Sequence, residues 1–391
     1  MLPLLFFRTR TASLHPMARL RVLHIASWYP SEAHGTLGNF VQRHVEASAE
    51  RVDAEVWYVA RGESRIAERT HRGVKERIAY VSGRLPWFVQ VTCTLLRMAK
   101  HQARPDAIHL HVLYPAGIAA RLLARRWGVP LIATEHWTVY HRDQRAKLPV
   151  WRRLAIRWAG RGLDRLCPVT SQLGESLGDF GIQAPVHVVP NVVDTTLFKI
   201  APRTAPPVLL HISSLADEQK NVTGLIECFG LAADRLPAGT TLHIIGDGDP
   251  APHAATAERL GLSDRILTGG EIPLAEVAER MAAASAVLLF SRFENFPCVI
   301  PEAWAAGTPV VVTDVGGIRE HVPVWGTTDA EPERGACVAS EDAAAFVQAL
   351  LHTLEAAPDR GAMRRYAEAR FSVAAIGAAF EAVYTECLGR G

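Results

Sequence analysis

Short apolar runs alternate with helix-like segments along most of the chain, and this alternation is the feature that most limits its fold. In the first 200 residues the strand-like runs occupy 21–27, 55–60, 108–112, 131–136 and 165–170. A second series occupies 208–214, 242–247, 286–291 and 310–314. Near-continuous Val, Ile and Leu runs are typical of parallel sheets covered by helices on both faces. We therefore expect an α/β fold of two doubly wound, Rossmann-like domains that face each other across a cleft.

A proline-rich segment separates the two series. Three prolines between residues 201 and 207 can continue neither a helix nor a central strand, so this stretch is expected to be a hinge linker. The domains would then span residues 17–200 and 208–371. The remaining residues, 372–391, read as a helix with Ile376, Phe380 and Tyr384 on one face. We expect this helix to cross back to the first domain.

Composition and the amino end restrict the class of protein. Six cysteines are scattered without a C-x-x-C pair, which argues against a disulfide scaffold or a structural zinc site. No apolar run reaches the ~18 residues of a membrane span. The apolar stretch at residues 2–7 is too short for a signal sequence, and Met17 is a second candidate start. We therefore expect a cytoplasmic protein.

Charge is distributed unevenly along the chain. The first 200 residues carry 28 Lys and Arg against 15 Asp and Glu, whereas the whole chain has a net charge of only +2. The asymmetry fits either two surfaces that differ by chance, or a first domain that approaches an anionic partner such as a phosphorylated acceptor or a membrane. No nucleic-acid-binding pattern accompanies the charge, so no nucleic-acid partner is expected.

Residues 291–317 carry the most informative local pattern. A strand-like run ends at Ser291, a loop presents Glu294, and a helix is expected from about Pro297. Pro297 and Pro301 favour this boundary, because prolines are tolerated in a first helical turn, where amides lack partners within the helix. The amides that should point outward and bind a phosphate are those of Cys298, Val299 and Ile300.

Two carboxylates flank this expected phosphate site. Glu294 precedes the helix and Glu302 lies one turn inside it. Because carboxylates accept hydrogen bonds, the pair suits sugar hydroxyls rather than the phosphate itself. Taken alone, both residues fit equally well as solvated charges favoured by the helix dipole.

The same stretch resembles the signature of the retaining glycosyltransferases of family four (glycosyltransferases group 1). In that pattern Glu-x7-Glu is followed by Ala-x-Ala-x-Gly-x-Pro-Val-Val and then by Gly-Gly. This chain has Glu294 and Glu302 at that spacing, followed by Ala303, Ala305, Gly307, Pro309, Val310, Gly316 and Gly317. The resemblance extends over most of the chain from residue 21 and implies the GT-B fold.

The resemblance also implies roles for particular residues. Glu294 would hold hydroxyls of the transferred sugar, Glu302 would hold the ribose, and Lys220 would contact the donor diphosphate. His136 would face the reacting sugar and act with Glu294 as the second catalytic residue. The remaining implied donor contacts are Gly38, Ser214, Gly246, Gly270, Ile272, Asn295, Phe296, Cys298 and Val299. A histidine at a strand end or a loop lysine is otherwise often structural.

One position departs from the family pattern. Where the family usually has Gly-Arg-Leu, this chain has Ser213, Ser214 and Leu215. An arginine clamps phosphate through a charge-assisted pair of hydrogen bonds, so the loss puts donor affinity in doubt unless another cation substitutes. Arg292 is a candidate for this substitute cation.

Residues 142–165 are strongly basic, with eight Lys and Arg against two acidic residues. In the helix-like part, Trp151, Leu154 and Trp158 lie on one side, and Arg153 and Arg157 lie nearly opposite. Two interpretations stay open: a surface helix that packs its apolar side on the core, or a helix that contacts anionic lipid with aromatic anchors.

These observations favour a retaining glycosyltransferase that uses a nucleotide-diphosphate sugar. The resemblance implies no metal, no cofactor and no enzyme nucleophile. It also implies a saccharide or polyprenyl-diphosphate-linked acceptor, as in the assembly of cell-surface polysaccharide, lipopolysaccharide or exopolysaccharide, at the inner face of the membrane.

Three alternatives remain. A metal-dependent hydrolase would use ligands from His109, His111, Glu135, His136 and His141. An NAD(P) oxidoreductase would need a G-x-G-x-x-G motif after a first strand, which is absent from the sequence. The third alternative is a non-catalytic nucleotide-sugar-binding protein, because Ser214 stands where the family usually has an arginine.

Overall fold

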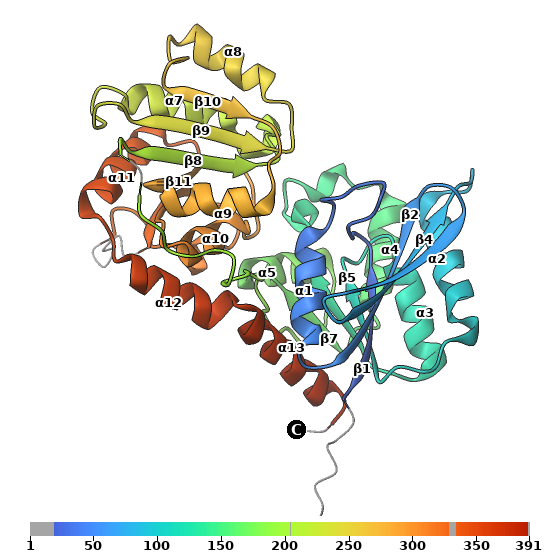
Figure 1. Cartoon of the computed structure of the whole chain (residues 1–391). Helices are drawn as coiled ribbons and strands as arrows, with labels where there is room; N and C mark the ends of the chain where they lie inside the picture. The colour runs from blue at the N-terminus through green and yellow to red at the C-terminus, as the bar shows by residue number, and fades with distance from the viewer. Residues whose placement is uncertain (1–18, 204, 328–333, 390–391) are drawn as a thin grey trace, which may run out of the picture.

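Two α/β halves lie side by side in the computed structural model, which describes residues 19–203, 205–327 and 334–389 (Figure 1). We call residues 19–200 the first half and residues 208–371 the second half. Each half contains one largely parallel sheet with helices on both faces, so the predicted class of two doubly wound, Rossmann-like domains is confirmed. The apolar stretch at 2–7 and the candidate starts Met1 and Met17 lie outside the described residues.

The first half is built on a seven-stranded sheet in the order β3-β4-β2-β1-β5-β6-β7. All neighbouring strands are parallel except β3 and β4, which form an antiparallel hairpin at one edge. The strands are β1 (Arg21–Ala26), β2 (Asp53–Arg61), β3 (Arg65–His71), β4 (Val74–Val81), β5 (Ala107–His111), β6 (Leu131–Glu135) and β7 (Arg165–Pro168). All five predicted apolar runs are strands.

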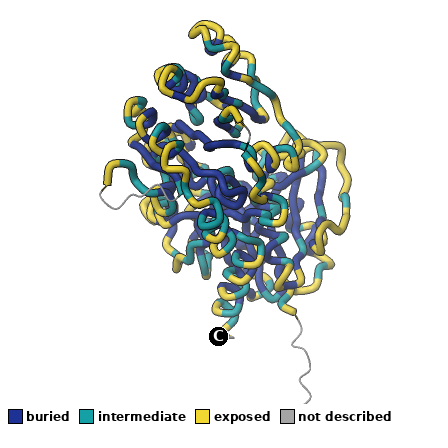
Figure 2. The backbone as a smooth tube through the Cα atoms, turned by 60° about the vertical axis from the view of Figure 1, so that its left-hand side comes forward, coloured by how far each residue is buried: buried dark blue, intermediate teal, exposed yellow. Residues whose placement is uncertain are grey.

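Helices cover both faces of this sheet because its strands are apolar on both sides. Along β1, Leu23 and Ile25 point to a core covered by α2 to α5, whereas Val22 and Ala26 point to a core covered by α1 and α13. The helices of the first half are α1 (Asn39–Ala49), α2 (Trp87–Met98), α3 (Gly117–Trp127), α4 (Val150–Gly160) and α5 (Ser171–Phe180). Figure 2 shows buried, dark blue segments of the chain running through the interior, with exposed, yellow segments around them.

The second half is built on a six-stranded, fully parallel sheet in the order β10-β9-β8-β11-β12-β13. Its strands are β8 (Val208–Ser213), β9 (Thr241–Gly246), β10 (Ile266–Gly269), β11 (Ala286–Leu289), β12 (Val310–Thr313) and β13 (Gly335–Val338). One face is covered by α9, α10 and α12, and the other by α7, α8 and α11. The helices are α6 (Asp217–Lys220), α7 (Val222–Ala232), α8 (Ala251–Arg259), α9 (Leu274–Ala283), α10 (Val299–Ala305), α11 (Ala343–Ala356) and α12 (Arg360–Phe371).

The last helix, α13 (Val373–Cys387), lies against the first half, as Figure 1 shows at the red end of the chain. Ser372 caps it by accepting a hydrogen bond from the amide of Ala375 (3.2 Å). Phe380 and Tyr384 are fully buried against α1 and the first sheet, and the Tyr384 hydroxyl lies 2.7 Å from His109 Nδ1. The last described helix therefore packs on the half that contains the first described strand.

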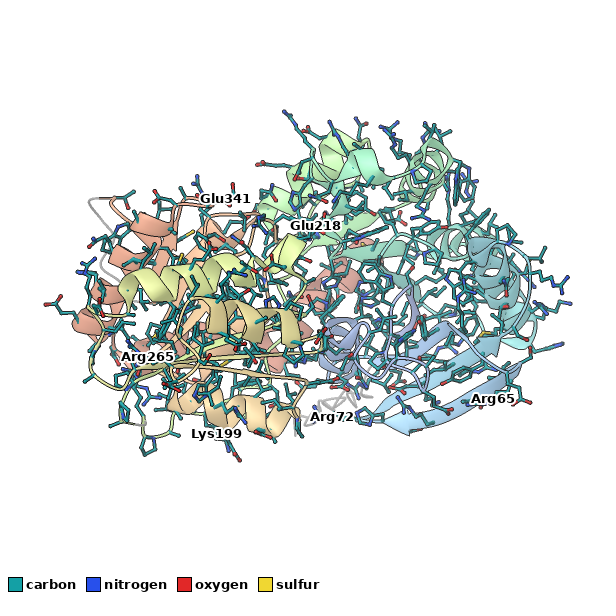
Figure 3. The ribbon with its side chains drawn as sticks, turned by 90° about the horizontal axis from the view of Figure 1, so that it is seen from above. Arg65, Arg72, Lys199, Glu218, Arg265 and Glu341 are labelled. Carbon is teal, nitrogen blue, oxygen red and sulfur yellow. The ribbon has the colours of Figure 1, made fainter. Side chains whose placement is uncertain are left out.

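The two halves also touch directly near the carboxyl ends of their strands. Lys147 Nζ lies 2.7 Å from Glu218 Oε1, and the amides of Ser171 and Gln172 donate to Glu320 at 3.0 and 2.9 Å. Figure 3 shows Glu218 between the halves, whereas Arg65 and Arg265 lie at opposite outer ends. The expected linker, residues 201–207, has no regular secondary structure where it is described.

Candidate active site

Glu294 and Lys220 form a buried ion pair at the edge of the second sheet. Glu294 lies in the loop after β11, and Lys220 ends α6, which follows β8. Lys220 Nζ lies 2.5 Å from Glu294 Oε1, and the side chains expose only 13% and 7% of their surface. Because β8 and β11 are neighbouring parallel strands, their carboxyl ends bring the two loops together. The predicted diphosphate-binding lysine therefore lies beside the predicted catalytic carboxylate.

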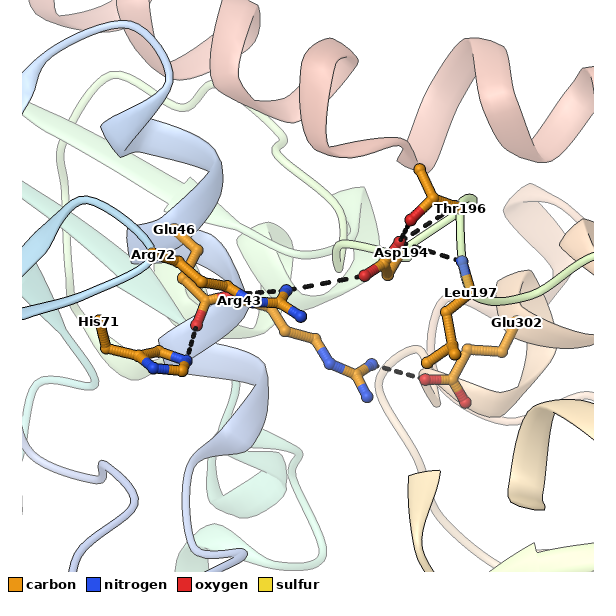
Figure 4. A network of polar contacts seen from close by, with 8 residues as sticks. All are labelled: Arg43, Glu46, His71, Arg72, Asp194, Thr196, Leu197 and Glu302. Carbon is orange, nitrogen blue, oxygen red and sulfur yellow. Dashed lines mark hydrogen bonds and ion pairs between the residues drawn. The ribbon is translucent and has the colours of Figure 1, made fainter. Parts of the chain in front are cut away.

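Glu302 pairs with a cation that was not singled out from the sequence. Arg43, on α1 of the first half, reaches across to α10, and its Nη1 lies 2.5 Å from Glu302 Oε1 (Figure 4). Both side chains are largely buried, with 16% and 4% of their surface exposed. Burial alone would lower the pKa of the Arg43 guanidinium, but the charge of Glu302 raises it above its ordinary value. Each of the two motif glutamates thus has a cation in contact.

The start of α10 differs in part from the expectation. The helix begins at Val299 and has seven residues, with Cys298 as its N-cap. The amide of Ile300 donates to the carbonyl of Pro297 (3.1 Å), so the prediction that it points outward is wrong. Burial raises the pKa of the Cys298 thiol to about 12, which keeps the thiol neutral. The role expected of the Cys298 and Val299 amides stays a prediction.

Asn295 and Phe296 do not present their side chains to a ligand. Asn295 donates from Nδ2 to the His136 carbonyl (2.6 Å) and accepts at Oδ1 from His141 (2.7 Å), so it joins the two halves. The Phe296 ring is 98% buried, because it packs in the second-half core beside His321 and Phe371. A donor contact through these residues would therefore have to use their backbone, and their predicted role stays a prediction.

The predicted glycine contacts have different structural reasons. At Gly38 φ is +74°, and an added Cβ would lie 2.5 Å from the Trp28 carbonyl carbon. The glycine at position 38 is thus required by the close approach of the Trp28 backbone, and its predicted contact with the donor stays a prediction. A Cβ at Gly246 would lie 1.9 Å from the Ser213 carbonyl oxygen, whereas one at Gly270 would meet open space. Ile272 is partly buried against the second-half core.

Ser214 is exposed, and Arg292 does not stand free in its place. The Arg292 guanidinium donates to the Asp217 carbonyl (2.7 Å) and to Asn221 Oδ1 (2.6 Å), and it lies 3.3 Å from Glu341. These bonds hold the segment that carries Lys220. Arg292 therefore supports the lysine instead of replacing the missing phosphate clamp.

His136 lies at the end of β6, facing the second half. Its ring packs between Phe40 and His44, with centroid distances of 4.5 and 5.0 Å. Burial, with a smaller effect of His44, holds the pKa of His136 well below its ordinary value, while Asn191 acts in the opposite direction. The imidazole is consequently neutral near pH 7. Its carbonyl accepts a hydrogen bond from Asn295, the neighbour of Glu294, so the structure brings the backbone of His136 close to the Glu294 loop, while the ring packs on first-half side chains.

Buried histidines form a cluster beside His136, and two sets of three have nitrogens within 4.8 Å: His24, His109 and His111, and His44, His111 and His136. Most of these rings already have partners. His109 contacts the Tyr384 hydroxyl and Thr134 Oγ1, both at 2.7 Å, and His44 Nε2 donates to the Pro190 carbonyl at 2.8 Å.

The ligands that a hydrolase would need are gathered only in part: His109, His111 and His136 belong to these two sets, whereas Glu135 and His141 belong to neither. The Glu135 carboxylate accepts hydrogen bonds from the amides of Leu113, His136 and Trp137 and from the Tyr140 hydroxyl. His141 binds Asn295 instead. Four donors on one carboxylate fix the turn after β6, so Glu135 has a structural role.

A cavity of about 420 Å³ lies between the halves. His141, Gln172 and Ser176 line it from the first half, and Phe293 and Glu294 line it from the second. A larger cavity, of about 660 Å³, lies between the β3–β4 hairpin and α2, away from both motif glutamates. Of these two cavities, the one of about 420 Å³ meets the candidate site, because Glu294 lines it.

The basic segment 142–165 contains α4, whose exposed side is apolar. Trp151 and Leu154 expose 48% and 59% of their surface, whereas Ile156 and Ala159 pack into the core. The interpretation that the Trp151 side packs on the core is therefore wrong. Several basic residues have acidic partners, namely Arg142 with Asp179, Lys147 with Glu218 and Arg165 with Glu386. No helix in the described part of the chain is long and apolar enough to cross a bilayer.

Sequence comparisons match both halves to one family. Residues 37–197 match "Glycosyltransferase Family 4", and residues 206–356 match "Glycosyl transferases group 1". The chain is 27% identical to glycogen synthase of Mycobacterium tuberculosis (strain ATCC 25618 / H37Rv), over 90% of this chain and 89% of that protein. It is 34% identical to the lipopolysaccharide 1,6-galactosyltransferase of Salmonella typhimurium, over 39% of this chain and 44% of that one.

Solved structures share the fold over nearly the whole chain. Sucrose-phosphate synthase from Thermosynechococcus elongatus superposes with a TM-score of 0.76 at 18% identity, over 95% of this chain and all of that one. Anabaena Alr3699/HepE in complex with UDP and glucose superposes with a TM-score of 0.72 at 18% identity, covering 94% and 100%. Together with the motif glutamates at the gap between the halves, these matches show that the chain belongs to the glycosyltransferases of family four, GT-B enzymes that transfer a sugar from a nucleotide sugar.

Proposed function

We propose that this enzyme transfers a sugar, with retention of configuration, from a nucleotide-diphosphate sugar bound between Lys220, Glu294 and Glu302. The observation that carries this proposal is the buried Lys220–Glu294 contact of 2.5 Å at the carboxyl ends of β8 and β11. A cation fixed beside a hydroxyl-binding carboxylate meets the two needs of a sugar diphosphate, because one end is anionic and the other is rich in hydroxyls. The second half is the proposed donor domain, and the first half is the proposed acceptor domain.

Catalysis would rest on positioning and electrostatics. Lys220, with the backbone of Cys298 and Val299, neutralises the departing diphosphate, Glu294 holds hydroxyls of the sugar, and Glu302 holds the ribose. The bond between the sugar C1 and the diphosphate oxygen breaks, and the acceptor oxygen forms its bond to C1 on the same face. The acceptor proton passes to the departing phosphate oxygen, so no base from the protein is needed. Closure about residues 201–207 excludes water.

The test is a thermal-shift screen with UDP-, GDP- and ADP-sugars. We expect one nucleotide class to raise the melting temperature of the wild type. The same nucleotide should raise the melting temperatures of Lys220→Met and Glu302→Ala much less. Lys199→Met is the matched control, because Lys199 is an exposed lysine outside the site (Figure 3). Equal stabilisation of the wild type and both site variants would refute the site assignment.

Turnover separates the enzyme from a binding protein. Slow release of the nucleoside diphosphate from the stabilising sugar nucleotide is expected in the wild type and should be lost in Glu294→Gln. Tight binding without any release, even with a panel of saccharide and polyprenyl-diphosphate-linked acceptors, would favour the non-catalytic alternative.

We further propose a peripheral contact with anionic lipid, which suits a lipid-linked acceptor in cell-surface polysaccharide assembly. Trp151 and Leu154 are exposed on α4, and the Trp151 ring contacts Phe88 at the start of α2, with centroids 5.4 Å apart. The Arg152 guanidinium lies over Tyr114, 4.8 Å from the ring centroid. Aromatic and cationic side chains together are typical of interfacial binding. Co-sedimentation with phosphatidylglycerol vesicles should fall in Trp151→Ser/Leu154→Ser, and unchanged binding would refute this contact.

A further inference from the structure

The proposed donor site lacks one cation. Lys220 supplies a single positive charge, while a nucleoside diphosphate brings at least two negative ones. The arginine usual in the family is replaced by Ser214, and Arg292 is engaged by Asp217, Asn221 and Glu341. A second cation must therefore come from elsewhere if the diphosphate is to be neutralised.

Arg43 has the position that such a cation requires. It lies on α1, the helix that Gly38 introduces after β1, and its guanidinium crosses from the first half to Glu302 of the second (Figure 4). The side chain is 16% exposed and has one short contact, Nη1 to Glu302 Oε1. The helix itself is held in place, since the next residue, His44, is fully buried and bonded to the Pro190 carbonyl.

Arg43 and Lys220 each contact one of the two motif glutamates, and they come from opposite halves. Arg43 lies 2.5 Å from Glu302 on α10, and Lys220 lies 2.5 Å from Glu294 in the loop that precedes α10. Cys298, the N-cap of α10, lies between the two glutamates in sequence, and the charges of both cations act to lower the pKa of its thiol, although burial dominates and raises it overall. The two ion pairs therefore lie on either side of the start of α10 in sequence.

We propose that Arg43 is the second diphosphate-binding cation of the donor site, contributed by the first half in place of the arginine missing at Ser214. This inference rests on the proposed function. In the structure Glu302 forms an ion pair with Arg43. When the donor binds, the ribose hydroxyls donate hydrogen bonds to Glu302, and the Arg43 guanidinium turns to the phosphate. A guanidinium can make two parallel hydrogen bonds to phosphate, which a lysine cannot.

The position of Arg43 has a consequence for closure. Because Arg43 and Lys220 belong to different halves, a diphosphate that contacts both would hold the halves together. Donor binding would then favour the closed arrangement of the halves because the diphosphate contacts both of them, in addition to any contacts made by the sugar.

The experiment is isothermal titration of the wild type and Arg43→Gln with the nucleoside diphosphate and monophosphate of the base selected in the screen. Arg43→Gln keeps a hydrogen-bond donor for Glu302, so the buried carboxylate is not left bare. We expect the diphosphate affinity to fall about ten- to a hundredfold, and the monophosphate affinity to fall less. Arg125→Gln, an exposed arginine on α3, is the matched control and should bind as the wild type does.

A second substitution tests whether Arg43 replaces the phosphate-binding arginine that is missing at Ser214. Ser214→Arg should restore much of the diphosphate affinity in the Arg43→Gln background, because it returns a guanidinium to the position usual in the family. Wild-type diphosphate affinity in Arg43→Gln would overturn the inference, as would an equal loss for diphosphate and monophosphate or a failure of Ser214→Arg to recover affinity. Failure of the proposed function looks different, because the wild type itself would then bind no nucleotide.

Discussion

Mild acid should destabilise the first half strongly, because its buried histidines resist protonation. Burial lowers the pKa of His24 to about 3 and that of His44 to about 4. Burial also holds the pKa values of His109, His111 and His136 well below 6.5, their value in an unfolded chain. The unfolded state therefore takes up more protons as the pH falls below about 6.5, and the free energy of unfolding decreases with it.

The expected magnitude follows from proton linkage. Consider one histidine that has a pKa of 6.5 in the unfolded chain and stays neutral in the folded state. Between pH 7 and pH 5.5 it lowers the free energy of unfolding by about 1.3 kcal/mol. Five such histidines remove about 6 kcal/mol, which is comparable with the whole stability of an ordinary domain. Burial also raises the pKa values of the Glu135 and Glu46 carboxyls, which acts in the opposite direction, but these are two groups against five.

Urea unfolding at the two pH values, followed by tryptophan fluorescence and far-UV circular dichroism, measures this loss. His44→Gln removes one titrating ring and keeps a donor for the Pro190 carbonyl, so its pH-dependent loss should be smaller by about 1.3 kcal/mol. His101→Gln changes an exposed histidine and should leave the loss unchanged. An unfolding free energy that stays constant between pH 7 and 5.5 would refute the reasoning, as would equal losses in the wild type and His44→Gln.

Three substitutions test other parts of the structure. Gly38→Ala should cost more than about 1 kcal/mol, because φ is +74° and the new Cβ would meet the Trp28 backbone; an equal urea midpoint would contradict this. Asn295→Ala removes two hydrogen bonds between the halves, worth about 2 kcal/mol together, and should increase the radius of gyration in small-angle scattering while the circular dichroism stays unchanged. Phe380→Ala opens a cavity between α13 and α1 and should cost about 3–5 kcal/mol in urea unfolding, so a loss below about 1 kcal/mol would argue against the observed packing.

Buried parallel strands could be predicted from the sequence because burial on both faces leaves a run of apolar residues. The hairpin of β3 and β4 could not be predicted in this way. Its edge strand, RIAERTH, is almost entirely exposed and carries charges such as Arg69, which pairs with the buried Glu76 of β4. An exposed edge strand does not need an apolar pattern, so nothing in its periodicity distinguishes it from a loop.

The candidate site shows a similar division. Glu294, Glu302 and Lys220 could be located because they lie in motifs at strand ends, where the fold itself gathers loops. Arg43 could not, since it is 259 residues from Glu302 and no local spacing records the contact. The motif spacing does not indicate where the Phe296 ring points, because packing in the second-half core turns that ring inward.

The final helix has a practical consequence for dissecting the enzyme. Ile376, Phe380, Val383 and Tyr384 complete the hydrophobic covering of the amino-terminal sheet, and an added Cβ at Gly377 would lie 2.4 Å from the Ala47 carbonyl oxygen. A fragment that ends at residue 200 lacks α13, so the apolar surface of α1 and the first sheet that α13 covers would be exposed to water. We expect such a fragment to aggregate when it is expressed alone. A synthetic peptide of residues 372–389, added to the fragment, should therefore bind this apolar surface and promote folding of the fragment.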